Sequence, residues 1–331
     1  MKLYNMKSLK IVCVVGACML GTSCVELDQY PAGEVASDLF WKTEADAEYA
    51  LNAVYMQARR QFNRDYVFDG NTEYYLFTGN VSTSQASGDI SLAYRGGKYD
   101  NPSSAYGGNF DTYYQQSYST INFANYTVDN IEKMLPNVKS EASKKKLQAF
   151  IGEARMLRAM AYFRLISMWG DVPYFDKTIN DNSEVEFITR TPIAEIYQHL
   201  YDDFTYAWEN LPDKPVALGR MDKWGALAFR GKLQLYWACW NRIDWPWNSS
   251  IAPNGGWPEL TTFTADPAAS AKAYKDAAAD FRKVIEESGI TLFRNGEPGD
   301  WGKMGECEVL PNYYYLFTPD ANEDRELMVG F

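Results

Sequence analysis

The spacing of apolar residues along the chain predicts a protein built mostly from α-helices. Apolar side chains recur at every third or fourth position, which places them on one face of a helix, in several successive stretches. The predicted helices cover about residues 43–58, 118–135, 140–169, 192–211, 221–240 and 267–288. The longest of them carries a regular apolar face made of Leu147, Ile151, Ala154, Leu157, Ala161, Leu165 and Met168.

Residues that favour helix ends mark several of these boundaries. Thr43 is a good N-cap and is followed by acidic residues, which stabilise the first turn of a helix. Thr191 is a second expected N-cap, with Pro192 at the first helical position. Gly170 and Gly289 directly follow predicted helical stretches and are expected to end two helices. Helix pairs that recur every several tens of residues predict a tetratricopeptide-like solenoid of helical hairpins.

Two segments interrupt the helical pattern. Residues 65–114 are rich in Gly, Ser, Asn and Tyr and lack helical periodicity, and the same is true of the segment after residue 240. Loops of this length in a compact protein usually carry function. We therefore expect a solenoid with long loop insertions, and we expect the ligand to be bound by these insertions.

The N-terminus has the three parts of a secretory signal. Three lysines precede an apolar run at residues 11–20, and the small residues Gly21, Thr22 and Ser23 follow. The apolar run is much shorter than the roughly 20 residues that span a bilayer as a helix. Cys24 directly follows the small residues, as in the lipobox of bacterial lipoproteins. The alternative is an ordinary signal with an incidental cysteine, because position 21 is Gly where a lipobox more often has Leu.

These features divide the chain into three expected parts. Residues 1–23 are predicted to be a lipoprotein signal peptide, and residues 24–42 to be the lipidated Cys24 with an acidic tether. Residues 43–331 are predicted to form a helical binding domain, which is long enough for a large core. Only Cys239 and Cys307 lie within residues 43–331, so this domain has at most one disulfide.

Charge and residue types exclude several classes of function. The net charge of −11 opposes binding to nucleic acid and to anionic lipid. His199 is the only histidine and falls within a predicted helix, where a packed or surface role is favoured over catalysis. Neither a zinc cluster nor a phosphate-binding glycine loop is present, so we expect no catalytic residue, no metal and no cofactor. Arg155 and Arg158 are expected to pair with acidic residues on neighbouring helices rather than to bind a ligand.

Aromatic residues in the two loop segments are the best candidates for ligand binding. Flat aromatic rings can cover the apolar face of a sugar ring, while polar side chains bond its hydroxyl groups. The alternative is that these rings pack the loops onto the helices. The candidate ligand-binding residues are Asp69, Tyr74, Tyr75, Tyr94, Arg95, Trp245, Trp247, Asn248 and Trp257.

Several motifs resemble those of the SusD-like (RagB/SusD) family of outer-membrane lipoproteins. The segment 153–173, EARMLRAMAYFRLISMWGDVP, resembles the long helix of the family and the turn that ends it. Shorter matches occur in the expected order at 40–55, 190–197, 219–228 and 315–326. Members of the family usually continue for a couple of hundred residues more, and the chain stops at Phe331 within an apolar strand-like segment. The resemblance thus implies that the C-terminal part is missing.

The resemblance implies a role in nutrient uptake at the outer membrane. A SusD-like protein would be lipid-anchored, face outward at the cell surface and bind an extracellular oligosaccharide. It would deliver this ligand to a SusC-like TonB-dependent β-barrel transporter. We expect a binding protein and not an enzyme. Two alternatives remain open: a peptide-capture lipoprotein of the same family, and an outer-membrane glycoside hydrolase, because the 43 acidic residues offer many carboxylate pairs.

Overall fold

The structure is a computed structural model that describes residues 40–63, 107–242 and 264–293, together with Tyr315 and Asp324. The six helices discussed here all belong to one compact unit, Lys42–Phe331. Their bounds are α3 (Glu44–Phe62), α6 (Gly107–Met134), α7 (Glu141–Trp169), α8 (Ile193–Asn210), α9 (Lys223–Trp240) and α10 (Pro267–Glu287). Two short 3-10 helices, Leu135–Asn137 and Asn182–Glu184, lie in the connections. The predicted mostly α fold is therefore confirmed.

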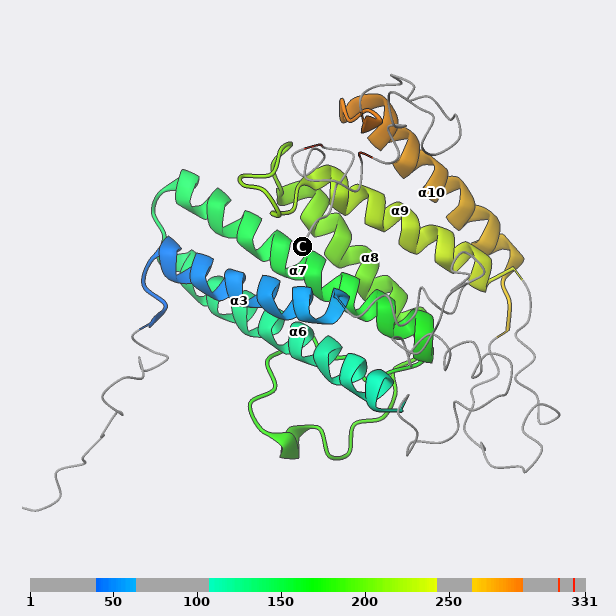
Figure 1. Cartoon of the computed structure of the whole chain (residues 1–331), viewed down its shortest axis with the longest axis horizontal. Helices are drawn as coiled ribbons and strands as arrows, with labels where there is room; N and C mark the ends of the chain where they lie inside the picture. Colours follow the sequence, from blue (N-terminus) through cyan, green and yellow to red (C-terminus); the bar gives the residue numbers. More distant parts are fainter. Residues whose placement is uncertain (1–39, 64–106, 243–263, 294–314, 316–323, 325–331) are drawn as a thin grey trace, which may run out of the picture. The chain divides into compact units, whose positions relative to one another are not determined.

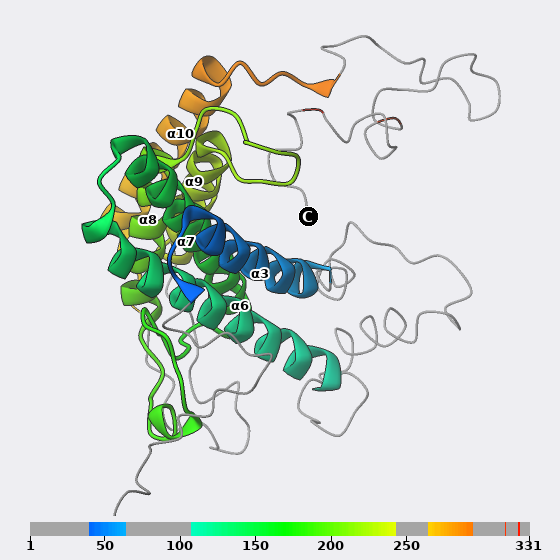
Figure 2. The ribbon, with the colours of Figure 1, turned by 90° about the vertical axis from the view of Figure 1, so that its left-hand side faces the viewer.

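Successive helices are antiparallel, so the chain runs back and forth through the helical stack (Figures 1 and 2). Between α6 and α7, the ring of Tyr114 near the start of one helix contacts Trp169 at the end of the other. Later pairs show the same relation: the start of α8 meets the end of α9, and the end of α9 meets the start of α10. The stack therefore has two ends, each made of alternating helix starts and helix ends.

The first predicted helix begins where the sequence indicates. The hydroxyl of Thr43 accepts a hydrogen bond from the backbone N–H of Asp46, and the Asp46 carboxylate accepts one from the N–H of Thr43. This reciprocal capping box satisfies two backbone donors at the start of α3. The predicted inner face is buried in the structure, with Ala47, Leu51 and Val54 fully inaccessible.

The predicted start of the fourth helix is wrong in its detail. Helix α8 begins at Ile193, and Pro192 is its N-cap without a side-chain cap bond. The Asp171 carboxylate accepts the hydrogen bond from the Ile193 N–H at 2.8 Å instead. The backbone N–H of Thr191 donates to the carbonyl of Val172. The cap of α8 therefore comes from the turn that follows α7, which a local sequence pattern cannot reveal.

Helix α7 is the central element of the unit. It packs against α3, α6 and α8, so side chains on nearly every side of its middle are buried. Six of the seven residues predicted for its inner face are buried, but Met168 is 40% exposed because it lies in the last turn. Gly170 ends the helix as predicted, with a φ of 66° that favours glycine.

The sequence places the start of α6 too late. Residues 107–114 are helical, although the glycine-rich and polar sequence there predicts a loop. Gly107 and Gly108 are poor helix formers, so the helix depends on burial of later residues such as Tyr113. The predicted face formed by Ile121, Ala124, Val128 and Ile131 is buried as expected.

Ion pairs join neighbouring helices, and the pair between Arg158 and Asp203 is almost completely buried. Arg158 on α7 forms two hydrogen bonds to Asp203 on α8, and Arg230 on α9 forms two to Asp280 on α10. Arg155 bonds Glu132 on α6 at 3.2 Å. The structural role predicted for the arginines of α7 is thus confirmed.

Small residues bring two helices into close contact. A methyl group at Gly231 of α9 would lie 2.9 Å from the ring of Phe281 on α10.

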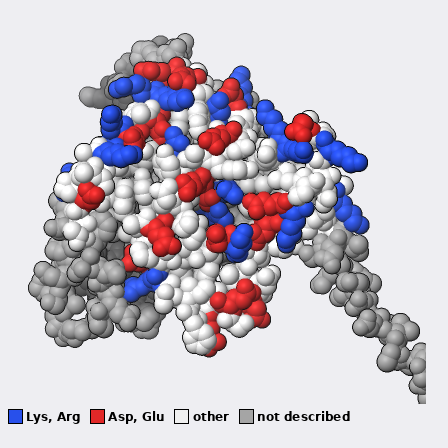
Figure 3. Space-filling view, turned by 180° about the vertical axis from the view of Figure 1, so that it is seen from behind, with Lys and Arg blue, Asp and Glu red and all other residues white. Residues whose placement is uncertain are grey.

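Among the described residues, no helix is long and apolar enough to cross a membrane. These residues also contain no group of three or more side chains that could hold a metal ion. On the face shown in Figure 3, acidic and basic side chains are interspersed.

Candidate functional site

One end of the helical stack collects the attachment points of both long insertions. The segment 64–106 joins the C-terminus of α3 to the N-terminus of α6, and the segment 243–263 lies between the C-terminus of α9 and the N-terminus of α10. These four helix termini lie at the same end of the stack because successive helices are antiparallel. We call this the loop end.

All nine predicted ligand-binding residues belong to these two segments and lie outside the described residues. The same holds for Cys24 and for Cys307, so neither the lipidation site nor a Cys239–Cys307 disulfide is tested. Cys239 is exposed, and its sulfur lies 3.3 Å from the hydroxyl oxygen of Tyr274. The described part of the site is therefore the surface of helices at the loop end.

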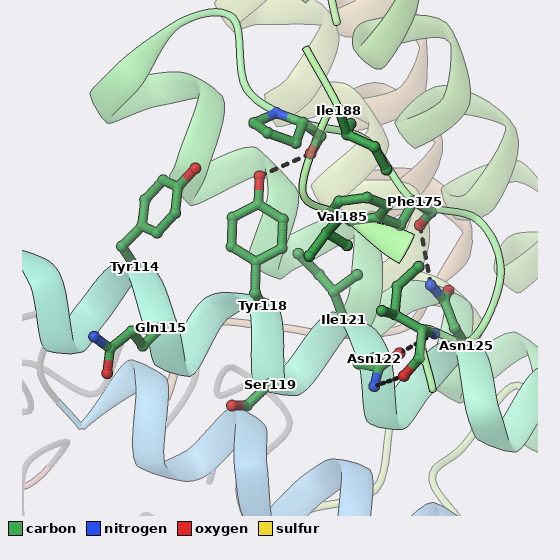
Figure 4. A pocket seen from close by; sticks show the side chains of 12 residues that line it. Tyr114, Gln115, Tyr118, Ser119, Ile121, Asn122, Asn125, Phe175, Val185 and Ile188 are labelled. Carbon is green, nitrogen blue, oxygen red and sulfur yellow. Dashed lines mark hydrogen bonds between the residues drawn. The ribbon is translucent and has the colours of Figure 1, made fainter. Parts of the chain in front are cut away.

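An apolar cavity of about 450 Å³ opens beside α6, near the loop end. Figure 4 shows the rings of Tyr114 and Tyr118 on one side, with Phe175, Val185 and Ile188 from the segment after α7 on the other. Three of its polar side chains, those of Tyr118, Asn122 and Asn125, form hydrogen bonds within the protein. Most of the lining that remains accessible is hydrocarbon, so the cavity suits an apolar group.

Hydrogen bonds from α6 hold the opposite wall of this cavity in place. The Asn122 amide donates to the carbonyl of Ile179 and accepts from its N–H, at 2.9 and 2.8 Å. The Asn125 amide donates to the carbonyl of Phe175, and the Tyr118 hydroxyl donates to the carbonyl of Pro173 at 2.7 Å. Burial raises the pKa of Tyr118 well above its usual range, so this hydroxyl remains a donor.

A second depression, of about 230 Å³, lies between α8, α9 and α10. We call it the three-helix groove. Its lining combines aromatic, small and polar side chains: Tyr197, Gln198, Tyr201, Gln234, Trp237, Ala269, Lys272, Ala273 and Asp276. The rings of Tyr197 and Trp237 stack at a centroid distance of 4.7 Å and an angle of 14°. This mixture resembles what a sugar requires, namely a flat apolar surface beside hydrogen-bonding groups.

Two groove residues flank one of the aromatic insertions in the sequence. Trp237 is in the last turn of α9 and Ala269 is in the first turn of α10, so the segment with Trp245, Trp247 and Trp257 starts and ends beside the groove. The sequence does not single out Tyr197, Trp237 and Lys272 as groove residues, because they lie on three different helices and each fits an ordinary helix position.

His199, the only histidine, lies on α8. It has the packed or surface role that the sequence favours over catalysis. Its ring stacks on Tyr174 at 4.3 Å, and its Nε2 lies 3.9 Å from the Glu195 carboxylate. Neither partner is a nucleophile of the kind that a histidine base activates.

The chain is similar to SusD-like proteins in sequence. A SusD-like family model, described as "Starch-binding associating with outer membrane", matches residues 33–235. A SusD-like protein of Formosa agariphila is 28% identical over 236 residues, which cover 70% of this chain and 43% of that protein.

Solved structures show the same fold. A SusD homologue from Bacteroides thetaiotaomicron superposes with a TM-score of 0.55 at 20% identity, covering 75% of this chain and 42% of that one. A laminarin-binding SusD-like protein superposes with a TM-score of 0.50 at 21% identity, covering 78% and 45%. The chain thus spans less than half the length of these relatives, and the predicted tetratricopeptide-like fold is confirmed.

Proposed function

Because the chain belongs to the SusD-like family, we propose that it is a surface lipoprotein that captures an extracellular oligosaccharide at its loop end. The observation that carries this proposal is the convergence of both aromatic insertions on one end of the stack, beside the three-helix groove. The family model describes starch binding and association with the outer membrane.

The proposed function also includes a lipid anchor and a partner transporter. Cys24 would carry the lipid, residues 24–42 would form the tether, and cleavage after residue 23 would remove the signal peptide. Multiple acyl chains on one cysteine would hold the protein firmly at the membrane. A binding protein held in this way does not itself move a ligand across the membrane. Delivery therefore needs a transporter, and a TonB-dependent β-barrel of the SusC type is the proposed partner.

Calorimetric titration of residues 24–331, with Cys24→Ser, tests the binding step. Linear hexasaccharides of neutral sugars are the first probes, with the β-1,3-linked glucose hexamer included because of the laminarin-binding relative. The proposal expects saturable binding of at least one of them and no release of shorter products on prolonged incubation. Binding of a peptide panel without glycan binding would contradict it, and so would released sugar.

A further inference from the structure

We infer that the three-helix groove is a subsite for one neutral sugar ring of the bound oligosaccharide. The inference rests on the proposed function. It adds where one ring of the oligosaccharide binds and that this ring is uncharged. The groove volume of about 230 Å³ is below the roughly 300–1,000 Å³ of pockets that take drug-sized molecules. It therefore suits a single ring rather than a longer piece of chain.

The walls of the groove offer a sugar its two kinds of contact. Tyr197 and Trp237 both line the groove, and their rings stack on each other nearly in parallel. Tyr201 lies one turn along α8, and the guanidinium of Arg230 covers its ring at 5.3 Å. These rings are held in place by the helices, so a sugar that packs on them costs little side-chain ordering.

The floor of the groove comes from small residues of α10. Ala269 and Ala273 are four positions apart on one face of the helix, and both line the groove. The depression exists because their side chains are methyl groups. A larger side chain at Ala269 would fill the space that we assign to the sugar ring.

The rim of the groove supplies hydrogen-bonding groups without net charge. Lys272 and Asp276 form an ion pair one helical turn apart, and both line the groove. A lysine ammonium has three donors, so the ion pair leaves capacity for sugar hydroxyls, and a carboxylate can accept several hydrogen bonds. Gln198 adds an amide whose Nε2 donates to Asp202. Because the charges balance, the rim favours a neutral sugar over an acidic one.

The position of the groove fits an extended ligand. Trp237 and Ala269 stand at the two ends of the connection that carries Trp245, Trp247 and Trp257. An oligosaccharide held by that connection would have a neighbouring ring within reach of the groove. The subsite would then add affinity for longer chains without being needed for the shortest ones.

The test compares two alanine-to-leucine variants of α10 by titration with the hexasaccharide that binds the unchanged protein, and with its trisaccharide. Ala269→Leu fills the groove, whereas Ala271→Leu adds the same volume on an exposed position of the same helix. We expect Ala269→Leu to weaken hexasaccharide binding at least tenfold and to remove most of the advantage of the hexamer over the trimer. Ala271→Leu should bind like the unchanged protein.

A second pair of variants removes a donor instead of filling space. Lys272→Met should weaken hexasaccharide binding several-fold, while Lys275→Met, at an exposed position outside the groove, should not. Unchanged binding in both Ala269→Leu and Lys272→Met would overturn the subsite and leave the proposed function standing. An unchanged protein that binds none of the hexasaccharides would overturn the proposed function, and the subsite with it.

Discussion

Arg158 on α7 and Asp203 on α8 form a two-point ion pair in the interior of the helical stack. Nη2 and Nε of the guanidinium lie 2.7 and 2.8 Å from the two carboxylate oxygens. Nη1 also donates to the side-chain oxygen of Asn125 on α6, so one arginine joins three helices. Both members of the ion pair are almost completely buried, which makes the pair sensitive to loss of either partner.

Replacing this arginine should destabilise the fold strongly. Arg158→Met keeps most of the side-chain volume but leaves the Asp203 carboxylate buried without its counter-charge. We expect the free energy of unfolding to fall by about 3–5 kcal/mol, measured by urea denaturation. Lys144→Ala, which removes an exposed ion pair with Glu141 on the same helix, should cost only about 0–1 kcal/mol. Equal effects of the two changes would contradict the structural role assigned to Arg158.

The cap of α8 gives a direct comparison between the sequence-based prediction and the structure. Asp171→Ala removes the acceptor for the Ile193 N–H and should lower the free energy of unfolding by about 1 kcal/mol. Thr191→Ala removes the residue that the sequence predicts as the cap, and it should have a smaller effect because its backbone bond to Val172 remains. Parallel urea titrations measure the free energy of unfolding of both variants. A larger loss in Asp171→Ala would support the cap seen in the structure, and a larger loss in Thr191→Ala would support the cap predicted from sequence.

Lipidation at Cys24, if it occurs as proposed, should make detergent-phase partitioning and fatty-acid labelling of the protein depend on this cysteine. In cells that express the full chain, the unchanged protein should partition into the detergent phase and incorporate labelled fatty acid. Cys24→Ser should abolish both, because the serine hydroxyl does not take the place of the thiol to which the lipid is attached. Cys239→Ser is the matched control, and its partitioning should be unchanged. Fatty-acid labelling that persists in Cys24→Ser would refute the anchor.

Oligosaccharide affinity should depend little on pH near neutrality. Burial raises the pKa of Tyr197 to about 12, and the hydrogen bond to Asp276 raises the pKa of Lys272. A raised pKa keeps each group protonated to higher pH, so the phenol stays neutral and the ammonium stays charged from about pH 6 to 9. Titration at several pH values should give dissociation constants that agree within about threefold. A steep loss of affinity between about pH 7 and 9 would show that one of these assignments is wrong.

The helices could be predicted from sequence because their signals are local. Thr43 and Asp46 cap α3 within four residues, and the apolar faces repeat at the helical period. Features that depend on distant residues could not be predicted. Asp171 caps a helix that begins 22 positions later, and the start of α6 relies on burial of Tyr113 despite two glycines.

Aromatic residues outside the helical pattern indicate a sugar-binding surface, and this stays a prediction because these residues lie outside the described part of the chain. The segments that carry them are attached at one end of the stack. The three-helix groove could not be found from the sequence. Tyr197 and Trp237 are 40 positions apart and stack only because α8 and α9 are antiparallel, while each of them fits an ordinary helix position.

We propose that the aromatic insertions at the loop end bind an oligosaccharide. Titration of Trp245→Ala and Trp247→Ala with the hexasaccharide that binds the unchanged protein tests this proposal. Loss of a ring that stacks on sugar should cost about 2 kcal/mol, or roughly 30-fold in the dissociation constant. Tyr49→Ala is the control, because this 67% exposed ring lies near the start of α3, at the other end of the stack. We expect a large loss of affinity in at least one tryptophan variant and none in the control. Unchanged affinity in both tryptophan variants would contradict it.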